Sequence, residues 1–439
     1  MRLIKLFIIA LAAHLVTSNL NAQKPLTKSV KAEVVNKLAR SLTDNYIFAD
    51  KAQNMKNLIR KNLAAGLYDN IIYPEEFAYN LTKDLRSVYK DLHLSISFNP
   101  RLEKRLSDTS GKSRTEHTKA IEDAKSQNFG FKKAEIINGN IGYIQFDGFY
   151  DLNEGSRTKV ESVFTSLRSS EALIFDLREN GGGSPDMVAY ICSFLFNKPT
   201  HINDLYVRRT NKTQSYWTEP VKGSEVFSSL PVYVLISNRT FSAAEEFAYD
   251  LQVLHRALLI GETTGGGAHP VSPQLITNGF IGNIPYARAV NPVTKTNWEA
   301  VGVLPDIKVA ANDALDAAVL AFYDSDIASL KDTTKLKTIQ WSRTMLNAKI
   351  HPYNVDTLTL KSYTGKFGNE TFTYNNGALY MKAKNGNTSS LVALSQATFK
   401  PAEFDHFKLK FIENTAGQII GVLITFKDGY IMTVKKGPE

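Results

Sequence analysis

The sequence of 439 residues contains one cysteine, Cys192, and no long apolar run after its first residues. A single cysteine excludes an internal disulfide. Cys192 lies in the apolar run VAYICSFLF, where a buried structural thiol is expected rather than a reactive one. Because a bilayer span needs about 20 apolar residues, no integral membrane span is expected in the mature chain.

The chain also lacks a cluster of basic residues, although its formal net charge is +9. Scattered lysines and arginines are typical of a solvated surface, whereas nucleic-acid binding needs a basic patch. No nucleic-acid partner is therefore expected. A hydrophobic content of 43% and a charged content of 22% are those of a globular protein and exclude bulk disorder or a fibrous chain.

The N-terminus has the pattern of a secretory signal peptide over residues 1–22. Arg2 and Lys5 precede a short apolar core, and Ala22 offers a small residue for cleavage. The pattern predicts an exported protein that is periplasmic or extracellular.

Periodicity divides the rest of the chain into three expected domains. Residues 23–130 contain three segments with helical spacing, one of them starting at Pro74, then the strand pattern LHLSISF. The polar, charged residues 101–128 are expected to form a linker or mobile loop.

Residues 131–328 alternate short apolar strand segments with helical segments, which predicts an α/β core rich in parallel βαβ units. Asn278-Gly279 between apolar stretches predicts a late hairpin. In residues 340–439, alternating segments with Asn-Gly and Asp-Gly steps predict a small antiparallel β module.

Two segments of the expected core are candidates for chemistry. In PVYVLISNRTFSAAEEFAYDLQVL, Ser242 opens a helix after a strand, so its hydroxyl and the amide of Ala243 share the helix N-terminus. Such a serine can also be a plain N-cap. In ALIFDLRENGGGSPDMVAY, three glycines follow a strand and precede a helix; they allow close backbone approach, or form a flexible turn or anion nest.

These two segments, together with GETTGGGAH and NWEAVGVLPDI, resemble peptidase family S41 over roughly residues 25–325. The likeness is to the tricorn-like and interphotoreceptor retinoid-binding protein-like branch of the C-terminal processing peptidases. It implies a ClpP/crotonase-like core between the helical domain and the β module. It also implies that Ser242 is the nucleophile, with oxyanion amides from Ala243 and from Gly182 or Gly183.

The resemblance further implies which residues activate the serine. Where one branch has a lysine in a Gly-Lys-Gly turn, this chain reads Thr264 to Ala268 without one, so His93 is the implied base and Glu299 the orienting acid. His269 is the alternative base, because it follows the glycine run. The tricorn protease has a serine before its histidine, where this chain has Leu92, which leaves open how Glu299 contacts His93.

The function implied is an exported serine peptidase that cleaves a peptide or unfolded protein by acyl transfer, with no metal or organic cofactor. The alternative is a non-catalytic carrier of apolar ligands on the same scaffold, because a fold does not settle function. An intact set of serine, histidine and glutamate favours the enzyme, since a serine is inert without a neighbouring base.

Overall fold

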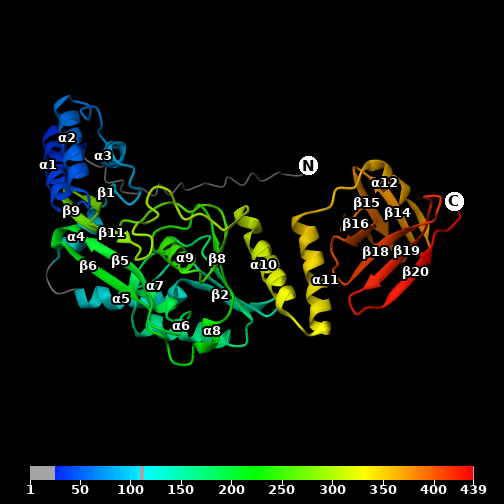
Figure 1. Cartoon of the computed structure of the whole chain (residues 1–439). Helices are drawn as coiled ribbons and strands as arrows, with labels where there is room; N and C mark the ends of the chain where they lie inside the picture. Colours follow the sequence, from blue (N-terminus) through cyan, green and yellow to red (C-terminus); the bar gives the residue numbers. More distant parts are fainter. Residues whose placement is uncertain (1–24, 109–112, 439) are drawn as a thin grey trace, which may run out of the picture. The chain divides into compact units, whose positions relative to one another are not determined.

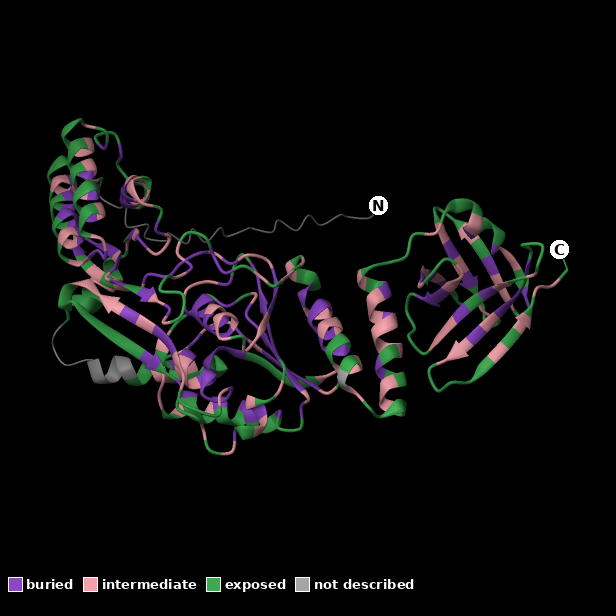
Figure 2. Cartoon of the chain, viewed as in Figure 1, coloured by how far each residue is buried: buried purple, intermediate pink, exposed green. Residues whose placement is uncertain are grey.

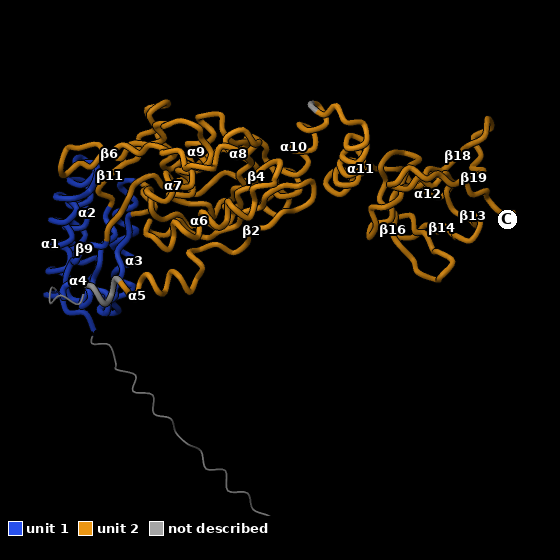
Figure 3. Tube along the Cα trace, turned by 90° about the horizontal axis from the view of Figure 1, so that it is seen from below, with its two compact units in different colours: residues 1–89, 94–108, 273–284 blue, residues 90–93, 109–272, 285–439 orange. Residues whose placement is uncertain are grey.

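The computed structural model describes residues 25–108 and 113–438, and the expected signal peptide lies outside these described residues. The chain divides into two compact units, drawn in Figure 3. The first consists of the segments up to residue 89, 94–108 and 273–284. The second consists of residues 90–93, 109–272 and 285–439.

The first unit is helical, as the apolar spacing predicts. Its helices are α1 (Lys28–Asn45), α2 (Ala49–Ala64), α3 (Pro74–Val88) and α4 (Pro100–Ser107). Pro74 occupies the first turn of α3, where its missing amide hydrogen costs nothing. Strand β1 (Ser95–Phe98) pairs with β10 (Phe280–Pro285), which pairs with β9 (Val271–Thr277).

The hairpin between β9 and β10 confirms the turn predicted from sequence. Asn278 and Gly279 have φ angles of 52° and 85°. Two consecutive positive φ angles suit an Asn-Gly step in a tight hairpin. The expected linker at 101–128 is wrong, because α4 and α5 (Ser113–Ser126) occupy most of it. Its charged residues are the solvated faces of short helices, as the exposed side chains of α4 illustrate.

The second unit contains the α/β core that the alternation predicts (Figure 1). Its sheet has the order β12-β8-β7-β4-β3-β2; neighbours from β3 to β12 are parallel and β2 is antiparallel. The strands are β2 (Phe131–Ile137), β3 (Ile141–Phe146), β4 (Ala172–Asp176), β7 (Val232–Ile236), β8 (Leu258–Gly261) and β12 (Ile307–Lys308).

Helices cover both faces of this sheet, so its middle strands are buried throughout, as Figure 2 shows. One face packs in a hydrophobic cluster with α6 (Glu154–Ser166), α7 (Pro185–Cys192) and α9 (Ala243–Val253). The other packs with α10 (Ala314–Ser329) and α11 (Thr333–Ile350). Burial on both faces explains why β4 and β7 read as unbroken apolar runs. Cys192 is buried, and burial raises the pKa of its thiol.

A second small sheet, of order β11-β5-β6, was not expected from the sequence. It contains β5 (His201–Val207), β6 (Lys212–Trp217) and β11 (Ala287–Val290). The remaining short elements of the core are η1 (Asn128–Gly130), η2 (Arg208–Thr210), α8 (Glu225–Ser228) and η3 (Ala311–Asp313).

The C-terminal region is the antiparallel β module that the alternation predicts, preceded by α12 (Thr357–Ser362). Its eight strands pair in sequence order, and a bridge between Phe367 and Lys436 joins the first strand to the end of the chain. The sheet is therefore barrel-like. The strands are β13 (Gly365–Phe367), β14 (Glu370–Asn375), β15 (Ala378–Lys382), β16 (Thr388–Ala393), β17 (Thr398–Pro401), β18 (Phe407–Glu413), β19 (Ile419–Phe426) and β20 (Ile431–Lys435).

Candidate active site

Ser242 lies between β7 and α9, beyond the carboxyl end of β7. Its backbone angles are φ 56° and ψ −122°. Such a conformation costs a non-glycine residue about 1–3 kcal/mol and persists only when the surrounding structure holds it. Glu245, three residues further on, reaches back to the amide of Ser242 in a capping box. The hydroxyl of Ser242 also contacts a side chain outside the helix.

That contact is His93, from the segment that precedes β1. The Nε2 atom of His93 lies 3.0 Å from Oγ of Ser242, within hydrogen-bond reach. The imidazole also packs on the ring of Phe241, with centroids 4.6 Å apart. On the side of Gly267, a methyl group in place of hydrogen would come within 2.6 Å of Cε1 of His93. Glycine at 267 therefore makes room for the ring.

The glycine turn after β4 lies directly against Ser242. A Cβ on Gly182 would lie 2.7 Å from Cβ of Ser242. The amide of Gly182 is already engaged, because it donates to Oδ1 of Asn180 at 2.9 Å. The bridge to Phe149 uses the carbonyl of Gly182 and the amide of Ser184. In a parallel bridge of this kind the amide of Gly183 points away from Phe149.

The amide of Ala243 occupies the first position of α9, where helical amides have no partner within the helix. The helix macrodipole adds partial positive charge at this end. The amide of Ala243 and the backbone of the glycine turn thus lie beside Ser242.

Glu245 holds the backbone at Ser242 and at the glycine loop in place. Its carboxylate accepts hydrogen bonds from the amides of Ser242, Gly266 and Gly267 at 2.9, 2.7 and 2.8 Å, and from the hydroxyl of Thr264. The pKa of Glu245 is raised because burial has a larger effect than these hydrogen bonds, which act in the opposite direction. One buried carboxylate therefore joins Ser242 to the glycine loop on which His93 packs.

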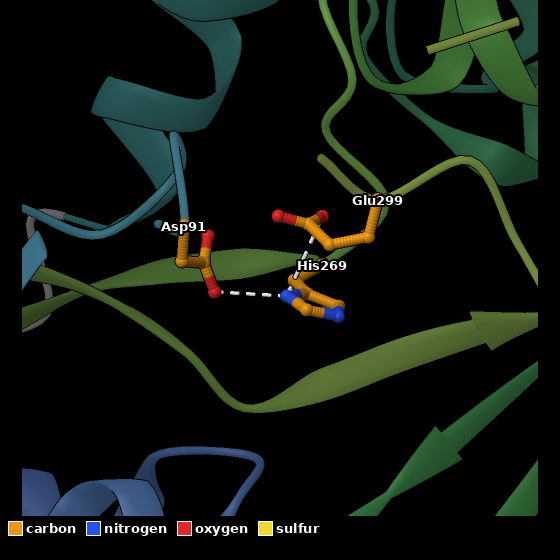
Figure 4. A group of neighbouring side chains, drawn as sticks. All are labelled: Asp91, His269 and Glu299. Atoms are coloured by element: carbon orange, nitrogen blue, oxygen red, sulfur yellow. Dashed lines mark hydrogen bonds and ion pairs between the residues drawn. The ribbon is translucent and has the colours of Figure 1, made fainter. Parts of the chain in front are cut away.

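A second histidine lies in a buried cluster, shown in Figure 4. Nδ1 of His269 is 2.8 Å from Oδ2 of Asp91 and 3.5 Å from Oε2 of Glu299. Asp91 also accepts the backbone amide of His93 at 3.1 Å, and Glu299 accepts the amide of Ala268 at 2.6 Å. The pKa of Glu299 is raised to about 7, because burial outweighs the favourable charge of His269.

Among the described residues, this cluster is the one group whose side chains could hold a metal ion, with ligand atoms within 4.8 Å of one another. Within the cluster, Nδ1 of His269 is hydrogen-bonded to Asp91, which also accepts the amide of His93. These contacts tie the segment that carries His93 to the segment that carries His269.

A cleft of about 870 Å³ opens over Ser242, and all its lining residues belong to the second unit. His93, Gly182, Gly183 and Ala243 line it with Ser242. Of the remaining residues singled out from sequence, Glu299 and His269 belong to the buried cluster, whose side chains are 5% and 1% exposed.

Sequence reasoning missed two residues that hold this site. Glu245 stands three residues after Ser242, a spacing that itself signals a side chain reaching back to a helix N-terminus. Asp91 carries no comparable signal, because its partner His269 is 178 residues away in the sequence.

Comparison with known proteins identifies the family. The model of peptidase family S41 matches residues 140–309, and that of the N-terminal domain of peptidase S41 in eukaryotic IRBP matches residues 25–128. Together they cover more than half of the chain. The chain therefore belongs to peptidase family S41, a family of serine peptidases.

The curated relatives share part of this chain. The tail-specific protease of Haemophilus influenzae (strain ATCC 51907 / DSM 11121 / KW20 / Rd) is 29% identical over 175 residues, which are 39% of this chain and 22% of that protein. The carboxy-terminal processing protease CtpA of Bacillus subtilis (strain 168) is 26% identical over 197 residues, 44% of this chain and 39% of that protein. The match thus spans well under half of either relative.

Among solved structures, the photosystem II D1 C-terminal processing protease aligns with a TM-score of 0.42 at 15% identity. The alignment covers 64% of this chain and 93% of that chain. In the part of the chain that the structure describes, no helix has the length and apolar content to cross a membrane.

Proposed function

We propose that the protein is a serine peptidase in which Ser242 is the nucleophile and His93 the general base. The observation that carries the proposal is the 3.0 Å contact between Oγ of Ser242 and Nε2 of His93 at the start of α9. The membership of family S41 and the names of the relatives, both proteases, support the same reaction.

The proposed reaction is acyl transfer. Oγ of Ser242 forms a bond to the scissile carbonyl carbon while its proton passes to Nε2 of His93. The amides of Ala243 and Gly183 stabilise the oxyanion. The C–N bond then breaks as His93 gives the proton to the leaving amine. Water next attacks the acyl carbon while His93 takes its proton, and the ester bond breaks as His93 returns that proton to Oγ of Ser242.

Glu299 is proposed as the acid that supports the base. Its carboxylate binds the amide of Ala268, next to the glycine beside His93. The same carboxylate lies 3.5 Å from Nδ1 of His269, and in its ionised form it would favour positive charge on an imidazole that it supports. Asp91 is proposed to assist by fixing the backbone of His93.

The test is labelling with a fluorophosphonate probe, followed by mapping of the modified residue. We expect the probe on Ser242, and neither labelling nor peptide cleavage in Ser242→Ala. The alanine variant should stay folded, since it removes at most a helix cap worth about 1 kcal/mol. Absence of labelling and cleavage in the parent protein would favour the alternative, a non-catalytic carrier of apolar ligands.

We further propose, from the sequence of residues 1–22, that the protein is exported. N-terminal sequencing of the protein recovered outside the cytoplasm should then begin at Gln23. An intact N-terminus on cytoplasmic protein would contradict export without affecting the proposed reaction.

A further inference from the structure

The cleft over Ser242 carries charge of one sign, although the chain as a whole has a formal net charge of +9. Three carboxylates line it, those of Asp151, Asp186 and Glu246, and no lysine or arginine is among its described lining residues. A cleft lined by one sign of charge raises the local concentration of ligands of the opposite sign.

Glu246 is the unusual member of the three. The residue is 5% exposed, and its Oε1 atom has no hydrogen-bond partner among the described residues. Oε1 is itself buried, but Glu246 lines the cleft, and because buried polar atoms are normally paired, this oxygen points to a donor that enters from the cleft. Burial raises the pKa of Glu246 to about 7; hydrogen bonding by the neighbouring Asn203 side chain opposes this shift, and the negative charge of Asp186 adds to it.

Among the described residues that line the cleft, no lysine or arginine compensates this charge. Asp186 and Glu246 both act electrostatically on Tyr216, which also lines the cleft, so the two acids lie at the same part of it. We call Asp186 and Glu246 the acidic wall. One turn further along α9, burial and the negative charge of Glu246 raise the pKa of Asp250.

The acidic wall lies close to the nucleophile. Glu246 is four residues after Ser242, and its amide donates to the carbonyl of Ser242 at 3.0 Å in the first turn of α9. Residues four apart on a helix lie on the same face, about 5–6 Å apart at Cβ. A side chain next to the attacked carbonyl can therefore reach Glu246.

We propose that the acidic wall is a subsite for a cationic side chain, lysine or arginine, on the residue whose carbonyl Ser242 attacks. This inference rests on the proposed peptidase function and names its substrate class. The ammonium or guanidinium group would donate to Oε1 of Glu246, supply its missing partner and favour its ionised form. A substrate carboxylate would meet the same field as repulsion.

The experiment compares two fluorogenic peptides that differ only in charge, with lysine or Nε-acetyl-lysine at the residue before the scissile bond. Fluorophosphonate labelling is measured first and reports on the nucleophile independently. We expect the parent protein to prefer the lysine peptide by about tenfold or more in kcat/KM, as for a hydrogen bond to a charged group. Mass spectrometry should place the cut after lysine.

The variant Glu246→Gln keeps the shape of the side chain and should reduce the preference ratio to within about threefold of unity. Asp186→Asn, at a less buried position, should lower the ratio by a smaller factor. Glu135→Gln removes an exposed carboxylate from β2 and should leave the ratio unchanged.

Three results would overturn the proposal. The first is a labelled, active protein that cleaves both peptides equally, or that prefers a free C-terminal carboxylate. The second is an unchanged ratio in both Glu246→Gln and Asp186→Asn. The third is a parent protein that neither labels nor cleaves, which removes the peptidase function itself and the subsite with it.

Discussion

Glu245 and Glu246 are consecutive acids in the first turn of α9, and both are buried, at 0% and 5% exposure. Glu245 accepts hydrogen bonds from three amides and one hydroxyl. Glu246 faces the cleft with one oxygen unpaired among the described residues. The same residue type therefore occupies two opposite electrostatic situations within one helical turn.

The difference distinguishes two sides of the site, the nucleophile side around Ser242 and the side of the acidic wall. On the nucleophile side, every contact of Glu245 is internal, so its charge fixes Ser242 and the glycine loop before any ligand arrives. On the side of the acidic wall, Asp186 and Glu246 line the cleft, and no lysine or arginine among its described lining residues compensates their charge. A preorganised backbone suits the stabilisation of a transition state, whereas an uncompensated charge suits selection of a substrate.

The largest effect is expected where the nucleophile side loses its base. His93→Ala should lower kcat/KM by about 10⁴-fold or more, because members of a catalytic unit act together. His269→Ala should lower it less, since His269 pairs with Asp91 in the buried cluster. Steady-state kinetics of both variants checks this, and the reverse ranking would show that the wrong histidine was assigned as base.

Next in size is the loss of the carboxylate that holds the nucleophile side. Glu245→Ala leaves buried amides of Ser242, Gly266 and Gly267 without their acceptor. Each unsatisfied group costs about 1–3 kcal/mol, so the free energy of unfolding should fall by roughly 3 kcal/mol or more. Denaturant unfolding measures this.

The kinetics of Glu245→Ala distinguish positioning from bulk stability. In the folded fraction, kcat should fall by about 10²-fold while KM changes little, because the oxyanion amides and Ser242 lose their alignment. A folded variant with parental kcat would contradict the positioning role of Glu245.

The acidic wall should affect how the free energy of unfolding depends on pH. The pKa of Glu246 is raised to about 7 in the folded protein, so Glu246 binds a proton more tightly there than in the unfolded chain. The contribution of Glu246 to the free energy of unfolding is then most favourable below its pKa of about 4.5 in the unfolded chain, and it is lost as the pH rises towards 7.

Replacing Glu246 by glutamine removes this loss. At pH 8 Glu246→Gln should be more stable than the parent by up to about 3 kcal/mol, and near pH 4.5 the two should be nearly equal. Thermal unfolding at the two pH values measures the difference. A glutamine variant that is equally stabilised at both pH values would show that Glu246 does not titrate with a raised pKa.

The smallest effect is expected behind the base. Asp91→Asn weakens the acceptor of the His93 amide and the ion pair with His269. We expect a loss of about tenfold in kcat/KM, equivalent to one charged hydrogen bond of about 1.4 kcal/mol. A parental rate of fluorophosphonate labelling in this variant would limit Asp91 to a role in folding.

Local patterns determined much of this fold. Apolar spacing predicts α1 to α3, alternation predicts the order of strands and helices in the core, and Asn278-Gly279 predicts its hairpin. These features depend on neighbours within a few residues, which the sequence displays directly. Charged residues 101–128 misled the prediction, since a short solvated helix and a loop have similar composition.

The sequence by itself also placed Ser242 at a helix start and the glycine turn after a strand, and its resemblance to family S41 made His93 and Glu299 candidates, with His269 as the alternative base. Only the tertiary structure decided which histidine lies on Ser242, because the two are 149 residues apart. Only the structure shows that Glu245 is paired with backbone amides whereas Glu246 lines the cleft, because both positions carry the same residue type. The physical reason is that pairing and burial depend on contacts closed by the whole fold, whereas periodicity depends on the chain's immediate neighbours.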